Sequence, residues 1–261
     1  MGTQTHRSDS RVLSRRTLER DHRRLKAVLA PGMCVLDAGC GTGAITAGIA
    51  RKVGPAGEVV GLDRDESLLA EACESYGYLE NLSFRVEDIQ SLSYENHFDV
   101  VTAARVLQWV NDPELAMRQM CKAVKPGGRI VVLDYNHADL KLEPEPPAEF
   151  AAFYDSFLRW RDANGWRNRM GDNLPQMFAS AGLSEVQVHV EDELSERGDE
   201  ASSIWCHVMD TTGMQMVEAG FMNGAELQTA INAYGSYVKH DLNQQTLVLR
   251  AVEGWKSISQ I

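Results

Sequence analysis

The chain has 261 residues, of which 44% are hydrophobic and 24% charged, and its formal net charge at pH 7 is -11. This size and composition are ordinary for a globular protein with a sizeable core, built as one large domain or two small ones. The excess of acidic residues argues against a broad nucleic-acid surface, because phosphate binding depends on accumulated Lys and Arg. We therefore expect a small-molecule partner and no nucleic acid.

No apolar run approaches the ~20 residues that a membrane span needs, and residues 1–9 are polar, without the apolar core of a signal peptide. We therefore expect a cytoplasmic protein with no membrane span. The five cysteines lie far apart and form no C-x-x-C pair. The sequence thus predicts reduced thiols, with neither a disulfide framework nor a zinc or other metal site.

Seven arginines crowd the first 24 residues, several of them at four-residue spacing: Arg7, Arg11, Arg15, Arg16, Arg20, Arg23 and Arg24. This spacing favours a solvated amphipathic helix that leads into the first strand. A phosphate or tRNA contact and an Arg-rich transit peptide are the alternatives. Asp9, Glu19 and Asp21 weaken the transit-peptide alternative.

A strand, a glycine-rich loop and a helix follow one another early in the chain. The apolar run Met33–Leu36 predicts a buried strand, Asp37 follows it, and Ala44–Val53 predicts a helix. The glycines between them stand at positions 39, 41 and 43. Because glycine has no Cβ and a helix start presents free N–H groups, this arrangement predicts a site for a nucleotide-like ligand.

Two chemistries use such a loop. Gly39-x-Gly41-x-x-Ala44, with Asp63 further on, fits the dinucleotide fingerprint. Asp37, however, would repel a pyrophosphate and would suit a ligand that carries an ammonium and a sulfonium, as S-adenosylmethionine (SAM) does. Val35–Gly43 resembles the first motif of class I SAM-dependent methyltransferases. The cofactor contacts expected here are Asp37, Gly39, Cys40, Gly41 and Gly43, with Cys40 filling the loop.

The next two strands end in acids that match later motifs of this family. Glu58–Leu62 predicts the second strand, and Asp63 after it can accept hydrogen bonds from both ribose hydroxyls, with Arg64 beside it. Leu82–Val86 predicts the third strand. The resemblance implies that Asp88 binds the adenine amino group and that Ile89 lies against the adenine ring.

Phe98–Thr102 predicts the fourth strand, and residues 103–109 resemble the fourth motif of the family. The resemblance implies that the Ala104 carbonyl meets the methionine ammonium of SAM and that Arg105 and Trp109 face the cleft. Many relatives carry histidine at positions 108 and 109, where this chain has Gln and Trp. That departure removes one common catalytic base.

Asp112-Pro113 predicts a helix start, and this helix is expected to run to Lys125, before Pro126-Gly127-Gly128. Residues 125–128 followed by the strand 129–133 are among the more specific signals of the family. Strand and helix alternate five times, which predicts a parallel sheet with helices on both faces. The expected fold is α/β and Rossmann-like: a doubly wound, mostly parallel seven-stranded sheet with helical lid insertions.

The second half of the chain predicts two inserts within one domain overall. The Pro-rich residues 143–147 predict a stiff linker, and apolar aromatics from 150 to 160 predict one face of a helix. By resemblance, a closing strand at 245–251 runs antiparallel to the others. The segments that we expect are an N-terminal helix and SAM-binding core in 1–135, a lid in 136–173, a core continuation in 174–198, a second insert in 199–240, and the closing strand and tail in 241–261.

These patterns indicate a SAM-dependent methyltransferase that methylates an O, N or C atom of a small, partly apolar acceptor by in-line displacement. The closest resemblance is to the branch with quinone-biosynthesis methyltransferases. His137, after the fifth strand, is the candidate base, with Tyr135 and Arg105 near it. An NAD-dependent oxidoreductase and a catalytically silent SAM-binding regulatory protein are the alternatives. The sequence identifies neither the acceptor nor a choice between monomer and homodimer.

Overall fold

The computed structural model describes residues 10–258, which form two compact units. The core unit comprises residues 10–134, 170–191 and 250–258, and the insert unit comprises residues 135–169 and 192–249. None of the helices formed by residues 10–258 has the length and apolar content needed to cross a bilayer.

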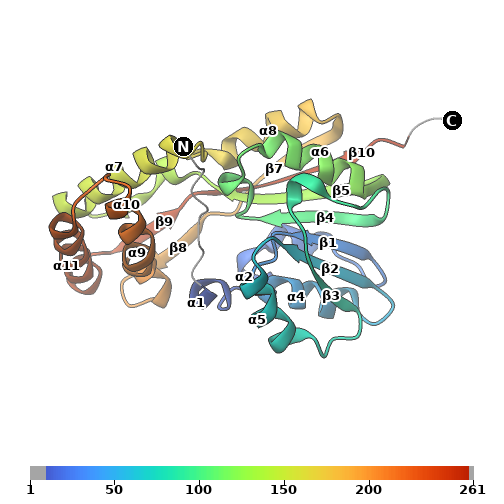
Figure 1. Cartoon of the computed structure of the whole chain (residues 1–261), viewed down its shortest axis with the longest axis horizontal. Coiled ribbons are helices and arrows are strands. Elements are labelled where there is room, and N and C mark those ends of the chain that lie inside the picture. Colours follow the sequence, from blue (N-terminus) through green and yellow to red (C-terminus); the bar gives the residue numbers. More distant parts are fainter. Residues whose placement is uncertain (1–9, 259–261) are drawn as a thin grey trace. The chain divides into compact units, whose positions relative to one another are not determined.

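The core unit is built on a seven-stranded sheet with the order β3-β2-β1-β4-β5-β10-β7 (Figure 1). Strands β3, β2, β1, β4 and β5 are parallel neighbours, whereas β10 pairs with β7 in antiparallel register. This sheet confirms the predicted fold class. The strands are β1 (Cys34–Ala38), β2 (Glu58–Asp63), β3 (Leu82–Val86), β4 (Phe98–Ala104), β5 (Val124–Tyr135), β7 (Leu183–Val190) and β10 (Leu249–Lys256).

The central strands β1, β2 and β4 are buried on both faces of the sheet, where alternate side chains along each strand point to opposite sides. Leu36 of β1 lies in a hydrophobic cluster with residues of α6 and α8, and its neighbour Val35 lies in another cluster with residues of α2, α3 and α4. The helices of the core unit are α1 (Ser10–Leu13), α2 (Leu18–Asp21), α3 (Arg23–Val28), α4 (Ala44–Val53), α5 (Glu66–Tyr76), α6 (Pro113–Ala123) and α8 (Met170–Ser180).

The helix starts follow the local sequence. Asp112 accepts a hydrogen bond from the backbone N–H of Leu115, and Pro113 takes the first helical position, as predicted. Asp65 caps α5 in the same way. Helix α6 ends at Ala123 rather than Lys125, because residues from Val124 onward already belong to β5.

The single amphipathic helix predicted for the arginine-rich stretch is wrong: residues 10–28 form three short helices. Thr17 caps α2, and its own N–H donates to the Asp21 carboxylate at 2.6 Å. His22, with φ of -153°, then separates α2 from α3. Local side-chain bonds therefore interrupt the helical spacing of the arginines. Arg7 lies outside the described residues.

The insert unit combines a small antiparallel sheet with helices. Its sheet has the order β6-β9-β8, formed by β6 (Lys141–Glu143), β9 (Gln244–Leu247) and β8 (Glu193–Glu196). Its α-helices are α7 (Ala148–Ala163), α9 (Ile204–Val208), α10 (Met214–Glu218) and α11 (Gly224–His240). Phe150 of α7 stacks on Tyr234 of α11 with ring centroids 4.3 Å apart, so the predicted aromatic stripe forms core.

The predicted closing strand 245–251 is two strands in the structure. Residues up to Leu247 pair in the sheet of the insert unit, and residues from Leu249 onward pair in the seven-stranded sheet. The carbonyl of Val248, between them, accepts the N–H of Asn136 at 2.8 Å. No glycine, proline, asparagine or aspartate within 245–251 marks the change of sheet in the sequence.

Candidate active site

Four residues that the sequence assigned to the cofactor lie at one edge of the core sheet. Asp37 and Asp63 are at the ends of β1 and β2, Ala104 ends β4, and Asp88 follows β3. These strands are parallel neighbours, so their carboxyl ends meet at the same edge. Ligands of open α/β sheets bind at this edge.

The glycine loop is tied to β2 by backbone hydrogen bonds. The N–H groups of Gly39 and Cys40 donate to the Leu62 carbonyl at 2.7 and 2.9 Å, and Gly41 N–H donates to the Asp63 carboxylate at 2.8 Å. Gly39 has φ of 82°, which other residues rarely adopt. The loop that follows β1 is therefore held beside the end of β2.

Packing, as well as ligand access, explains two of the glycines. A Cβ at Gly39 would lie 2.5 Å from a methyl of Val106, and one at Gly43 would lie 2.7 Å from the Phe84 ring. A Cβ at Gly41 would lie 3.0 Å from Leu13 of α1. The N-terminal segment thus packs against the glycine loop.

The hydroxyl of Thr42 shows that the loop fits a polar ligand. Thr42 is 4% exposed, and its Oγ1 has no hydrogen-bond partner among the described residues. A buried hydroxyl without a partner costs roughly 1–3 kcal/mol, so a ligand that bonds it would remove this penalty. Thr42 lay inside the motif as an unspecified position, and only the structure distinguishes it.

Asp37 is buried in the sheet edge, with 3% of its surface exposed, and accepts a hydrogen bond from Thr46 Oγ1 at 2.7 Å. Burial raises the pKa of its carboxyl to about 6; the Thr46 bond opposes this rise, and the charge of Asp63 adds to it. A cation beside these two carboxylates would be favourable. This environment fits the ammonium of SAM.

The carboxylate of Asp63 has a structural role as well. One oxygen accepts Gly41 N–H and the other accepts Asp65 N–H at 3.0 Å. A carboxylate oxygen can accept more than one hydrogen bond, so ribose hydroxyls can share it. Arg64, next in the chain, is exposed.

Asp88 and Ile89 begin a short 3-10 helix at residues Ile89–Ser91. Asp88 accepts the Gln90 N–H at 2.8 Å and is half-buried. Ile89 is buried in the cluster that contains α6 and α8 side chains. Contact of either residue with adenine stays a prediction.

Arg105 lies after β4 with a positive φ of 63° and is 5% exposed. Its backbone N–H donates to the Leu133 carbonyl at 2.6 Å, and its Nη1 donates to the Asp21 carbonyl at 3.0 Å. The guanidinium therefore fastens the N-terminal segment within the core unit. Its predicted cofactor and catalytic roles stay predictions.

His22 occupies the same buried region as Arg105. Burial, helped by the charge of Arg105, lowers the pKa of His22 to about 3, so the ring is neutral. Thr102 Oγ1 donates its proton to the Val131 carbonyl at 2.8 Å and lies 3.0 Å from His22 Nε2. Nε2 must therefore carry the ring proton and donate it to Thr102.

Gln108, which stands where many relatives carry histidine, has a structural role in the turn after Arg105. Gln108 is buried, its N–H donates to the Asp134 carboxylate at 3.1 Å, and its Nε2 donates to the Arg105 carbonyl at 3.4 Å. Gln108 thus holds the turn together. Trp109 and Ala104 are half-buried in the core unit.

Tyr135 and His137 lie in the insert unit, whereas Arg105 lies in the core unit. The Tyr154 hydroxyl donates to the His137 carbonyl at 2.6 Å, and the Tyr135 and His137 ring centroids are 5.0 Å apart. Phe157 and Trp205 also pack against the His137 ring, at 5.6 and 6.2 Å. We call these five residues the aromatic cluster.

Trp205, like Tyr154 and Phe157, is a member of the aromatic cluster that the sequence did not single out as a site residue. It is 3% exposed, and its indole N–H has no hydrogen-bond partner among the described residues. Burial raises the pKa of Tyr154, so its hydroxyl stays protonated. The cluster thus offers a donor N–H within apolar walls.

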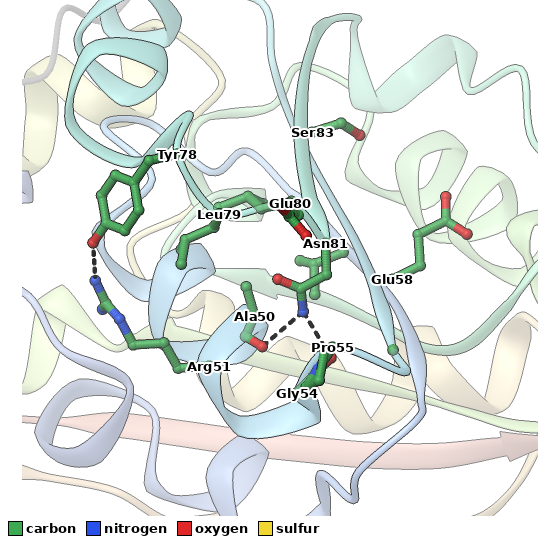
Figure 2. A pocket seen from close by; sticks show the side chains of 13 residues that line it. Ala50, Arg51, Gly54, Pro55, Glu58, Tyr78, Leu79, Glu80, Asn81 and Ser83 are labelled. Atoms are coloured by element: carbon green, nitrogen blue, oxygen red, sulfur yellow. Dashed lines mark hydrogen bonds between the residues drawn. The ribbon is translucent and has the colours of Figure 1, made fainter.

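A separate cavity, with a volume of about 790 Å³, lies at the opposite edge of the core sheet, where β2 and β3 begin (Figure 2). Arg51 donates to the Tyr78 hydroxyl at 2.9 Å, and Asn81 donates to the carbonyls of Ala50 and Gly54, both at 2.9 Å. Because the glycine loop is at the other edge, we do not assign the cofactor to this cavity.

Residues 29–182 match a family model described as a methyltransferase domain. Over 169 residues the chain is 31% identical to a demethylmenaquinone methyltransferase of Staphylococcus aureus (strain JH9), a match that covers 60% of this chain and 70% of the relative. A putative methyltransferase of Bacillus halodurans has a TM-score of 0.58 at 16% identity, covering 90% of this chain and 96% of its own. Phosphoethanolamine N-methyltransferase 2 of Haemonchus contortus, solved with S-adenosylhomocysteine, has a TM-score of 0.56 at 15% identity, covering 90% of this chain and 51% of its own.

The fold, the glycine loop and the match to the family model identify this chain as a class I SAM-dependent methyltransferase. The chain belongs to the methyltransferase-domain family and is a small-molecule methyltransferase with SAM as its methyl donor. The resemblance stated from the motifs is confirmed, including its distant relation to a quinone-biosynthesis enzyme. The alternative of an NAD-dependent oxidoreductase is wrong.

Proposed function

We propose that this enzyme methylates an oxygen or carbon of a planar, partly apolar acceptor of the phenol or quinol class. The observation that carries this proposal is the aromatic cluster, in which apolar rings surround His137 and the unpartnered N–H of Trp205. Such walls suit a flat ring, and the buried N–H suits an oxygen on that ring. The name of the Staphylococcus aureus relative supports the same class.

SAM supplies an electrophilic methyl group on a sulfonium. In the proposed arrangement, Asp37 and the Ala104 carbonyl face its ammonium, Asp63 holds the ribose, and Asp88 holds the adenine. Cys40, Ile89 and Trp109 contribute packing. The protein's task in an in-line displacement is to fix the acceptor behind the methyl and to exclude water.

A base is needed when the acceptor is a hydroxyl. We assign this role to the imidazole of His137, which would take the hydroxyl proton as the oxygen attacks. Tyr154 fixes the His137 backbone through the bond between its hydroxyl and the His137 carbonyl. Tyr135 packs against the imidazole and holds its plane.

The test is a transfer assay with SAM labelled on its methyl group. Demethylated quinols, simple catechols and ethanolamine-type amines are offered in parallel, and the products are identified by mass spectrometry. We expect label on the quinol or catechol. Label on the amines alone would overturn the proposal, and calorimetric titration with SAM beforehand establishes that the protein is competent to bind.

A further inference from the structure

Three different metal-binding side chains converge at the edge of the core sheet where the strands begin. Cys34 starts β1, Glu58 starts β2, and His97 directly precedes β4. Cys34 and Glu58 are register partners on neighbouring strands. The thiol, carboxylate and imidazole donor atoms all lie within 4.8 Å of one another. This edge is opposite the glycine loop, so the group is separate from the proposed cofactor site, although Glu58 also lines the cavity at this edge.

We propose that Cys34, Glu58 and His97 bind one divalent ion of the zinc type, with a fourth coordination position open to solvent. Thiolate, imidazole and carboxylate are the ligands that zinc uses in proteins, whereas magnesium and calcium prefer oxygen ligands alone. Three protein ligands of these types are enough to hold zinc when water fills the remaining position.

The distances suit this ion. Cys34 Sγ is 3.7 Å from Glu58 Oε2, and His97 Nε2 is 3.9 Å from the same oxygen. Tetrahedral zinc would set its donor atoms roughly 3.3–3.6 Å apart. The Cys34 and His97 donor atoms lie within 4.8 Å of each other, so these donors have to approach by up to roughly 1 Å. The side chains of His97 and Glu58 are 48% and 57% exposed, which leaves them room for this movement.

The backbone beneath the donors is fixed. Cys34 N–H donates to the Asp99 carboxylate at 2.8 Å, and His97 N–H donates to the Ala123 carbonyl at 2.8 Å. The His97 ring also packs on the edge of the buried Phe98, with centroids 4.8 Å apart. Ligands on rigid elements need less ordering when an ion binds.

Binding releases the thiol proton: the S–H bond of Cys34 breaks, a sulfur–metal bond forms, and the proton passes to solvent. Lys125 pairs with Asp99 at 2.6 Å, which keeps that carboxylate out of the ligand set.

The sequence predicted no metal site because the three ligands lie far apart in the chain and form no short motif. Strand pairing brings them together. Elsewhere in residues 10–258, no other three His, Cys, Asp or Glu donors converge within the same distance.

The test uses the 261-residue chain, reduced and without a tag, and Co²⁺ as a spectroscopic probe for zinc. We expect one equivalent of Co²⁺ to give a thiolate-to-metal absorption band, and Zn²⁺ to displace it. Cys34→Ser should abolish the band, whereas Cys73→Ser, at an exposed cysteine of α5, should retain it. Absence of the band in the parent protein, or its survival in Cys34→Ser, would overturn the proposal.

A second variant tests the proposal independently, in case Cys34→Ser does not fold. His97→Gln changes a half-exposed side chain and should weaken Zn²⁺ binding, measured by chelator competition, by at least the roughly tenfold that loss of an outer-sphere partner typically costs. Circular dichroism checks that the fold is kept. Unchanged Zn²⁺ affinity in folded His97→Gln would remove the imidazole from the site and overturn the three-ligand proposal.

Discussion

The carboxylate of Asp37 is buried at the end of β1 and accepts a hydrogen bond from Thr46 Oγ1 at 2.7 Å. Its pKa, about 6 in the folded protein, exceeds the ordinary 3.8 mainly because burial disfavours the charge. Between these two pH values the folded protein binds more protons at Asp37 than the unfolded chain does. The contribution of Asp37 to stability therefore falls as pH rises through this window and stays low above it.

Asp37→Asn should stabilise the protein at neutral pH, because it removes a charge that burial disfavours and keeps an oxygen for Thr46. The expected gain in the free energy of unfolding is on the order of 2 kcal/mol near neutral pH. Urea unfolding of both proteins near pH 4 and near pH 7.5 measures it, and the difference should shrink at the lower pH. An equal difference at both pH values would contradict the raised pKa.

The same substitution should weaken SAM binding. If the ammonium of SAM lies beside Asp37, binding favours the ionised carboxylate, so affinity should rise between about pH 5 and about pH 7. Calorimetry in two buffers of different ionisation enthalpy would detect the proton released. Asp37→Asn should bind SAM at least tenfold more weakly and lose most of this pH dependence. A parallel pH profile in the variant would remove Asp37 from the ammonium site.

Asp63→Ala should weaken SAM binding by at least tenfold, because it removes the proposed acceptor of the ribose hydroxyls and frees Gly41 N–H from its bond. Asp65→Ala is a matched control two residues away. Loss of that helix cap should lower stability by about 1 kcal/mol and leave SAM affinity unchanged. Calorimetric titration compares the two, and equal affinities would exclude Asp63 from the site.

Gly39→Ala should destabilise the core unit, because its Cβ would lie 2.5 Å from Val106 and its φ is 82°. The steric part of this cost should be relieved by a second change, Val106→Ala, whereas the backbone cost of roughly 1–2 kcal/mol should remain. Thermal unfolding of the single and double variants separates the two terms. No recovery in the double variant would show that Val106 can move aside.

Part of the fold and of the candidate site could be predicted from the sequence. The order of strands and acids placed Asp37, Asp63, Asp88 and Ala104 at one sheet edge, because alternating strands and helices allow few topologies. Local rules also located the start of α6 at Asp112 and Pro113. Periodicity was less informative where side chains compete for the backbone, as Thr17 does within the arginine-rich stretch.

Contacts between residues far apart in the chain could not be predicted from the sequence pattern. Leu13 against Gly41 and the convergence of Cys34 with His97 depend on tertiary packing, for which no spacing rule exists. The change of sheet at Val248 was not predicted either, because no turn residue separates the two strands in the sequence.

His137→Gln tests the proposed base. If the imidazole takes a proton from the acceptor, kcat should fall by roughly 10²–10⁴-fold, and the rise of kcat with pH should be lost, while SAM affinity stays unchanged. Tyr154→Phe is the matched control, because it removes only the bond to the His137 carbonyl and keeps the aromatic cluster filled. It should change KM for the acceptor more than kcat. Steady-state rates across pH distinguish the two, and a normal pH profile in His137→Gln would show that the acceptor loses its proton to another group.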